Sequence, residues 1–188
     1  MKKSLIVSIR FTLVTTILLG IIYPLVVTAF AHLALRDKAD GQLISRNGQV
    51  IGSRIIGQSF TSDKYFHSRP SAAGNGYDAT SSGGSNLAAS SQKLVTRIQG
   101  DVAKYQQDGN GQPVPIDLVT ASGSGLDPDI TPAAALYQVK RVAQARNLSE
   151  DAVRNLVMAH TQPRQFGILG EPRVNVLELN LALDQLAK

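Results

Sequence analysis

The chain has 188 residues, a formal net charge of +5, and no cysteine or tryptophan. Its length suits a single domain with an appendage rather than a multidomain enzyme, and the absence of cysteine excludes disulfides, a thiol nucleophile and cysteine-ligated metal sites. A basic chain suggests nucleic acid as a partner only if the basic residues lie on the folded domain, so their positions decide how the charge is interpreted.

An apolar stretch without charged residues covers residues 11–35. As a helix it would be roughly 37 Å long, enough to cross a hydrocarbon core about 30 Å thick with some tilt. Pro24 lies inside this stretch and is expected to loosen the helix around Gly20 and Ile21. We therefore predict a single transmembrane helix over residues 11–35.

This stretch divides the charges unevenly. Lys2, Lys3 and Arg10 contribute +3 before it, whereas the other 16 basic residues and all 14 acidic residues leave only +2 on residues 36–188. By the positive-inside rule, we expect residues 1–10 to be cytoplasmic and residues 36–188 to form an extracytoplasmic (periplasmic) domain. The charge is then mainly an orientation signal, and we expect no nucleic acid partner.

A cleaved signal peptide is the alternative to a retained anchor. Ala29-Phe30-Ala31 has the small-x-small form of a cleavage site, which would place the cut after Ala31. However, the apolar run is longer than a typical signal sequence and continues through Leu33 and Leu35. This length favours a retained anchor in the inner (plasma) membrane, and both alternatives place the main domain outside the cytoplasm.

Residues 36–188 predict one α+β domain with more helix than sheet, large enough to bury a single core. It begins with two short strands, 42–45 and 49–56, joined by Asn47-Gly48. This dipeptide between two strand-like runs is typical of a β-hairpin.

The stretch that follows, residues 58–85, is polar and irregular, yet it contains Tyr65, Phe66 and His67. A segment of this length without periodicity is either disordered or held by a partner. Its aromatic residues favour a partner.

Four helices and one more strand are predicted after this stretch, each helix from a capping residue or an apolar stripe at helical spacing. In chain order, the helices cover 86–105 with Asn86 as the cap and 108–111 as the stop, 132–146 after Thr131-Pro132, 149–161 with Ser149 as the cap, and a last segment from about Asn175. The strand is expected at 116–121, and 167–174 is expected to be a turn or a short strand.

The sequences that mark common catalytic sites are absent. There is no G-x-x-x-x-G-K-[ST] phosphate loop, no Asp-Lys-Thr-Gly, no H-E-x-x-H and no G-x-S-x-G. His32, His67 and His160 form no close ligand pair, so we expect no metal site. A Ser–His–Asp triad stays open only because serines and aspartates are plentiful.

Two loop motifs are candidates for ligand contact. Ser82, Gly83, Gly84 and Ser85 precede a predicted helix, where free N–H groups can hold an anion, although a loop with a cap is the simpler interpretation. The segment 123–132 contains two carboxylates but lacks the ligand pattern of an EF-hand, and we interpret it as a rigid turn.

Several segments match one known family, in this order along the chain. They are 57–60, 65–72, 82–87, 118–127, 130–132, 146–149 and 174–184. With the N-terminal anchor they cover nearly the whole chain, so the chain resembles the C-chain family of the bacterial Kdp-type potassium-transporting P-type ATPases.

The resemblance implies a single-pass accessory subunit that is not an enzyme by itself. In that family the A chain carries the potassium pathway, the B chain hydrolyses ATP, and a small F chain stabilises the complex. The C chain is needed for assembly and acts as a catalytic chaperone that raises the ATP affinity of the B chain. No tightly bound cofactor is implied, and ATP would be met only in a ternary complex with the B chain.

The resemblance also implies site residues. The family's glycine-rich loop, here Ser82, Gly83, Gly84 and Ser85, is likened to the signature loop of ABC ATPases and so to nucleotide contact. Ser85 stands where that loop has glutamine, and the expected topology puts the loop across the membrane from cytoplasmic ATP.

The long non-periodic loops 65–72 and 121–131 are the surfaces that we expect to contact the channel-like chain. The residues predicted for this contact are Tyr65, Phe66, His67, Arg69, Leu126 and Asp127. The alternative function is a membrane-anchored extracytoplasmic hydrolase or ligand-binding domain, which would have a pocket centred on His67 or His160.

Overall fold

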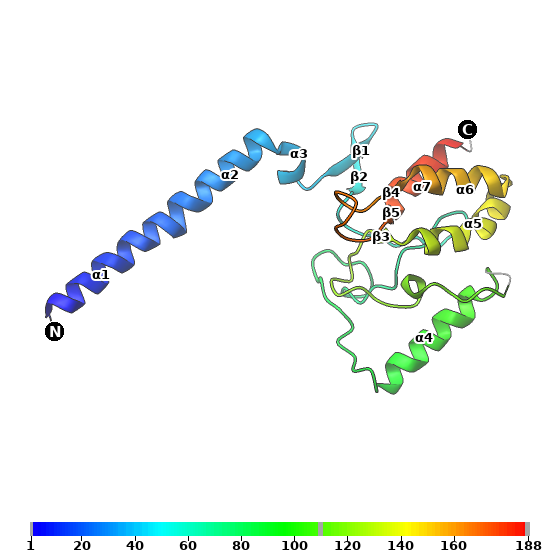
Figure 1. The fold of residues 1–188 in the computed structure, drawn as a ribbon, viewed down its shortest axis with the longest axis horizontal. Helices are drawn as coiled ribbons and strands as arrows, with labels where there is room; N and C mark the ends of the chain where they lie inside the picture. The colour runs from blue at the N-terminus through cyan, green and yellow to red at the C-terminus, as the bar shows by residue number, and fades with distance from the viewer. Residues whose placement is uncertain (1, 109–110, 187–188) are drawn as a thin grey trace. The chain divides into compact units, whose positions relative to one another are not determined.

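The computed structural model describes residues 2–108 and 111–186, and the chain divides into two compact units, residues 1–43 and 44–188. The first unit is one continuous helix followed by a short one (Figure 1). Its segments are α1 (Lys2–Ile17), the π-helical turn η1 (Leu18–Ile22), α2 (Tyr23–Ala34) and α3 (Arg36–Ala39). No side chain of α1, η1 or α2 is buried, and Lys2–Ala34 is long and apolar enough to cross a membrane.

The predicted weak point in this helix is confirmed. Pro24 has no N–H, and its ring interferes with the carbonyl of Gly20, four residues earlier. The helix responds with a π-turn at Leu18–Ile22, where the N–H of Tyr23 donates to the carbonyl of Leu18, five residues back. The helix begins at Lys2 rather than near residue 11, so the basic N-terminal residues are part of it.

The second unit is mixed helix and sheet, with more helix than sheet as predicted. Its segments are β1 (Leu43–Arg46), β2 (Gln49–Ser53), α4 (Gln92–Tyr105), the 3₁₀ turn η2 (Ile116–Leu118), β3 (Asp129–Ile130), α5 (Pro132–Arg146), α6 (Glu150–Ala159), β4 (Thr161–Gln162), β5 (Arg173–Asn175) and α7 (Val176–Leu186). Strands β1 and β2 form the predicted hairpin, and Asn47 and Gly48 at its turn both have positive φ. The other strands form a small antiparallel sheet in the order β3-β5-β4.

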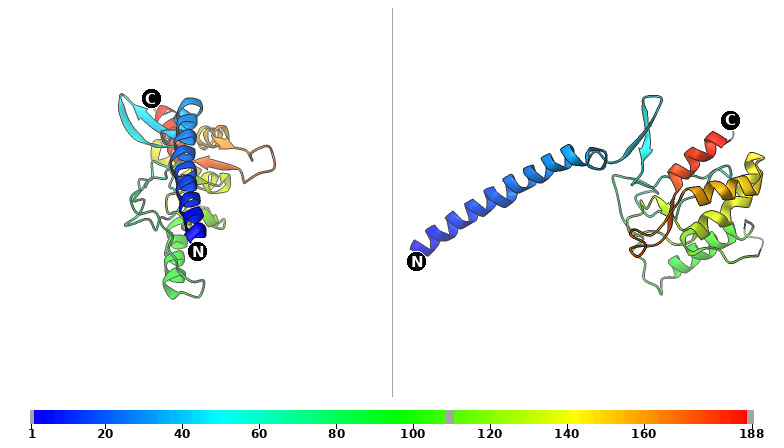
Figure 2. Two further views of the ribbon diagram at one scale, coloured as in Figure 1. Left: turned by 90° about the vertical axis from the view of Figure 1, so that its left-hand side faces the viewer. Right: turned by 45° about the horizontal axis from the view of Figure 1, so that its top comes forward.

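The core lies where α5, α6 and α7 pack together beside this sheet (Figures 1 and 2). Its fully buried side chains include valines and leucines from all three helices, together with one aromatic residue from the irregular stretch. These are Phe66, Val139, Val142, Val153, Val157, Leu179 and Leu183. The core is therefore built mainly from the last third of the chain.

The starts of these three helices are confirmed by their capping bonds. The side-chain oxygens of Thr131, Ser149 and Asn175 accept the backbone N–H of the residue three positions later, at 3.2, 3.2 and 3.0 Å. Each bond satisfies one of the N–H groups that an α-helix leaves free at its first turn.

Two predicted elements are wrong. The helix expected from Asn86 begins at Gln92, because Asn86 adopts a left-handed conformation (φ 50°) and Ser91 takes the extended conformation of an N-cap. The strand expected at 116–121 is the 3₁₀ turn η2, which the N–H of Val119 closes by donating to the carbonyl of Ile116. Helix α4 does end at Tyr105 as predicted, but residues 109–110 of the expected stop lie outside the described residues.

Two short strands were not predicted. Strands β3 and β4 have two residues each, too few for a period-two pattern to show. The segment 167–174 is a turn that leads into β5, which begins at Arg173.

Candidate functional site

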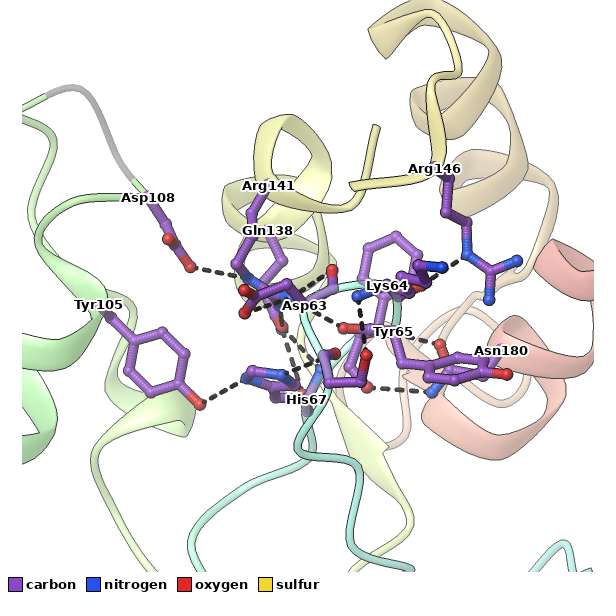
Figure 3. A network of polar contacts seen from close by, with 12 residues as sticks. Asp63, Lys64, Tyr65, His67, Tyr105, Asp108, Gln138, Arg141, Arg146 and Asn180 are labelled. Carbon is purple, nitrogen blue, oxygen red and sulfur yellow. Dashed lines mark hydrogen bonds and ion pairs between the residues drawn. The ribbon is translucent and has the colours of Figure 1, made fainter. Parts of the chain in front are cut away.

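The irregular stretch 58–85 is held in place by side chains of α5 and α7. Asn180 clamps Phe66: its Oδ1 accepts the Phe66 N–H at 2.9 Å and its Nδ2 donates to the Phe66 carbonyl at 3.0 Å. Gln138 does the same for His67, at 2.7 and 3.2 Å (Figure 3). Both amide side chains are buried, so four backbone groups of two consecutive residues are satisfied without a β-ladder.

Two arginines of α5 bind the residues just before this clamp. Arg141 donates to the carbonyls of Asp63 and Tyr65, at 2.8 and 3.1 Å, and to the Asp108 carboxylate at 2.9 Å. Arg146 donates to the carbonyl of Lys64 at 2.6 Å and lies 4.7 Å from the centre of the Tyr65 ring (Figure 3). The choice between disorder and a partner was therefore incomplete, because the chain's own helices order this stretch. Contact with a partner stays a prediction.

His67 is held in one tautomer. Its Nε2 lies 3.2 Å from the Ser62 carbonyl, which can only accept, so Nε2 carries the hydrogen and Nδ1 accepts from the Tyr105 hydroxyl at 3.3 Å. Burial, together with the nearby Arg141 guanidinium, lowers the pKa of His67 to about 4. Burial also raises the pKa of Tyr105 to about 12, which keeps the hydroxyl as a donor.

A pocket of about 160 Å³ lies beside His67, as the alternative function expected, and Tyr105, Arg69 and Lys104 also line it. However, both ring nitrogens of His67 already have hydrogen-bond partners within the chain. The group that accepts from Nε2 is the backbone carbonyl of Ser62 rather than a carboxylate. The geometry is that of a structural histidine and lacks the free lone pair of a general base.

Three segments, which contain Gly57, Ser71 and Gly83, meet at the turn 124–126. Gly57 donates to the Leu126 carbonyl at 2.8 Å, Ser71 Oγ to the Gly125 carbonyl at 2.6 Å, and Gly83 to the Ser124 carbonyl at 2.8 Å. We call residues 57, 69–77, 82–85 and 122–129 the loop cluster. Its centre requires glycine, since Gly125 has φ 67° and a Cβ there would lie 2.6 Å from the backbone nitrogen of Ala73.

An ion pair closes the loop cluster. Arg69 Nη1 lies 2.8 Å from Asp127 Oδ2, both side chains are partly exposed, and the Arg69 carbonyl accepts the hydroxyl of Tyr77. Beside the pair is a pocket of about 290 Å³ lined by both signs of charge, including Asp129 and Arg173. Burial raises the pKa of Asp129, and Arg173 opposes this shift.

The structure thus separates the predicted contact residues into two groups. Arg69, Leu126 and Asp127 come together with the glycine-rich loop in the loop cluster and are partly exposed. Phe66 and His67 face the core instead and are 0% and 4% exposed, while Tyr65 beside them is half-buried. The contact role of all six residues stays a prediction, but Phe66 and His67 present almost no free surface.

The sequence suggested that the glycine-rich loop lies at a helix N-terminus. This is wrong, because α4 begins only at Gln92. The N–H of Gly83 and the hydroxyl of Ser82 are both used in bonds to the Ser124 carbonyl. Nucleotide contact by this loop stays a prediction carried by the family resemblance. Among the described residues, no group of three or more histidine and acidic side chains is placed to hold a metal ion.

One surface feature was not predicted from the sequence. Between β4 and β5 the chain forms a hairpin-like loop whose tip exposes three large apolar side chains, Phe166, Ile168 and Leu169. Gly167 and Gly170, which lie in the same loop, could have indicated a turn here, since both adopt positive φ.

Comparison with known proteins gives one consistent result. The family model described as "KdpC: K+-transporting ATPase, c chain" matches residues 5–185. Three similar relatives are each named "Potassium-transporting ATPase KdpC subunit". They are from Koribacter versatilis (61% identical over 184 residues, 98% of this chain and 95% of the relative), Acidobacterium capsulatum (56% over 179 residues, 95% and 96%) and Mycobacterium tuberculosis (50% over 189 residues, 99% and 100%).

Proposed function

Because the chain belongs to the family of K⁺-transporting ATPase c chains, we propose that it is the non-catalytic accessory subunit of an ATP-driven, high-affinity potassium uptake complex. In this proposal the helix Lys2–Ala34 anchors it in the inner membrane with the N-terminus in the cytoplasm. The α+β domain then lies on the periplasmic side.

The observation that supports this role best is the family match along residues 5–185 of a chain with one membrane-spanning candidate among its described residues. One helix cannot enclose an ion pathway, because a pore needs several helices or a closed barrel around it. The sequence also lacks the phosphorylation motif of P-type ATPases. Transport and ATP hydrolysis would then be the work of other chains.

The partners in this proposal are the potassium-conducting A chain, the ATP-hydrolysing B chain and the small F chain. The subunit would act in assembly and as a catalytic chaperone that raises the ATP affinity of the B chain. Purifying the tagged chain from its native membrane tests this directly. We expect two larger membrane chains and potassium-stimulated ATPase activity to co-purify. Recovery of the chain alone, with hydrolytic activity or ligand affinity of its own, would support the anchored hydrolase or binding domain instead.

We place the partner contact on the exposed atoms of the loop cluster and on Tyr65. The buried residues Phe66 and His67 would contribute by fixing the position of this segment on the core. The ion pair between Arg69 and Asp127 permits a test that separates contact from folding. R69D and D127R each break the pair, whereas the double variant R69D/D127R restores it in reverse.

If the pair only holds the loops, the double variant should recover the wild-type yield of complex. If the pair also faces a charged partner, the single variants and the double variant should all lose yield while the double variant recovers stability. The second result is the one that we expect.

The most detailed part of the proposal is nucleotide contact by the glycine-rich loop, Ser82, Gly83, Gly84 and Ser85. A Cβ at Gly83 meets no atom within 4 Å, whereas a Cβ at Gly84 would lie 3.1 Å from the Gly123 carbonyl. G83A therefore changes the surface of the loop without a clash and is the cleaner probe. We expect it to reduce photolabelling of this chain by an ATP analogue in the assembled complex, and unchanged labelling would remove the loop from the proposal.

A further inference from the structure

The loop between β4 and β5 is the most exposed apolar feature of the second unit. Every residue from Gln162 to Glu171 is exposed, and Phe166, Ile168 and Leu169 are 91%, 76% and 54% exposed. In Figure 2 (left) the loop projects beyond its neighbouring elements. Contiguous exposed apolar groups of this kind mark interaction surfaces, since a solvated domain gains nothing from them.

The tip of this loop, residues 165–170, closes its own backbone. Gln165 and Leu169 exchange both N–H···O bonds at 2.9 Å, and the N–H groups of Gly167 and Ile168 donate to Arg164 and Gln165. Phe166 is held in the left-handed region at φ 53°, which is uncommon for a bulky residue. The tip can thus leave water without exposing these N–H groups to an apolar medium.

Charges are confined to the base of the loop. No charged residue lies between Gln165 and Gly170, whereas Arg164 and Glu171 form an ion pair of 2.6 Å across the base. An apolar tip above a charged collar matches the layered polarity of a bilayer surface. Apolar side chains enter the boundary between head groups and acyl chains, while charged groups remain at the head groups.

We propose that the tip of this loop, through Phe166, Ile168 and Leu169, inserts into the interfacial layer of the phospholipid bilayer that anchors the chain. Only residues 35–42 separate the end of α2 from the start of β1, a span of about 30 Å even if fully extended. Such a short tether raises the effective concentration of lipid at the domain, so a weak contact is enough. A specific protein interface would need roughly 800 Å² on each partner, more than three side chains supply.

The sequence provides a clean probe, because the chain contains no tryptophan. F166W in the full-length chain, reconstituted in phospholipid vesicles that contain no other protein, carries a single emitting indole at the tip. We expect lipids brominated near the head-group end of their acyl chains to reduce its emission roughly twofold relative to unbrominated lipids. I116W is the matched control, since Ile116 on η2 is also an exposed aliphatic residue (69%), and its emission should fall by less than about a tenth.

A second variant guards against distortion at Phe166. I168W places the indole two residues away, where φ is not positive, and should be quenched in the same way. Water-like emission from both variants, unaffected by bromine, would overturn the proposal. So would emission that shifts to the blue only when partner subunits are present and is still not quenched by bromine, because the occupant would then be protein. The proposal needs the membrane anchor but not the accessory role, so its outcome is independent of the co-purification test.

Discussion

Phe66 and Phe166 lie in two irregular segments of this domain, and their side chains have opposite surroundings. Phe66 in the stretch 58–85 is completely buried, whereas Phe166 in the loop between β4 and β5 is almost completely exposed. Neither segment forms a long strand or helix. The two segments differ in the elements that surround them. Buried amide side chains of α5 and α7 bind the first segment, whereas no core residue packs on the second.

The difference shows how irregular backbone can enter a protein core. A buried N–H or carbonyl without a partner costs about 1–3 kcal/mol, so irregular segments usually stay at the surface. Asn180 and Gln138 remove this cost for Phe66 and His67. The tip at Phe166 also satisfies its own amides, but its side chains remain uncovered and available to another surface.

The largest expected effect comes from truncating the two phenylalanines separately. F66A should lower the free energy of unfolding by about 3–5 kcal/mol, because it leaves a cavity among the core side chains. F166A should change it by less than about 0.5 kcal/mol, because the ring is already in solvent. Urea unfolding of the full-length chain in detergent, followed by circular dichroism, measures both. Equal effects from the two variants would contradict the comparison.

A smaller effect should follow from removing one amide clamp. N180L keeps the volume of the side chain but leaves the N–H and the carbonyl of Phe66 buried without partners, at a cost of about 2–4 kcal/mol. The matched control is N155L on the exposed face of α6, which should stay within about 0.5 kcal/mol of wild type. If N180L is as stable as N155L, the clamp does not hold the stretch.

The smallest effect is a pH dependence from His67. Its pKa is about 4 in the folded chain and 6.5 ordinarily, so between these values the unfolded state binds a proton that the folded state does not. The folded state is therefore most stable, with respect to His67, above pH 6.5, and it loses this stability as the pH falls towards 4. Between pH 7 and pH 5 the free energy of unfolding should fall by about 1–2 kcal/mol. Unfolding of H67N at these two pH values should lack this loss. An unchanged slope in H67N would assign the pH dependence to other groups.

The elements that the sequence predicted well depend on contacts within a few residues. Thr131, Ser149 and Asn175 cap helices through bonds to the third residue after them, and Asn47-Gly48 forms its turn by itself. Asn86 shows the limit of this reasoning. Asparagine favours both caps and left-handed turns, and the choice between them is not made by the neighbouring residues alone.

The site could be predicted as a set of residues but not as an arrangement. Arg69 and Asp127 were both expected at a contact surface, yet their ion pair joins positions 58 apart in the sequence. The clamps that Gln138 and Asn180 form span 71 and 114 residues, and a single amide on an apolar helix face does not reveal its partner.

The sequence by itself determined the apolar helix that is long enough to span a membrane, the three capped helices of the core and the membership of an ATPase subunit family. Each of these rests on local spacing or on an ordered series of motifs. Only the tertiary structure decided that Phe66 is internal and Phe166 external. Burial of a side chain depends on which distant elements cover it and satisfy its backbone, and no local pattern records that.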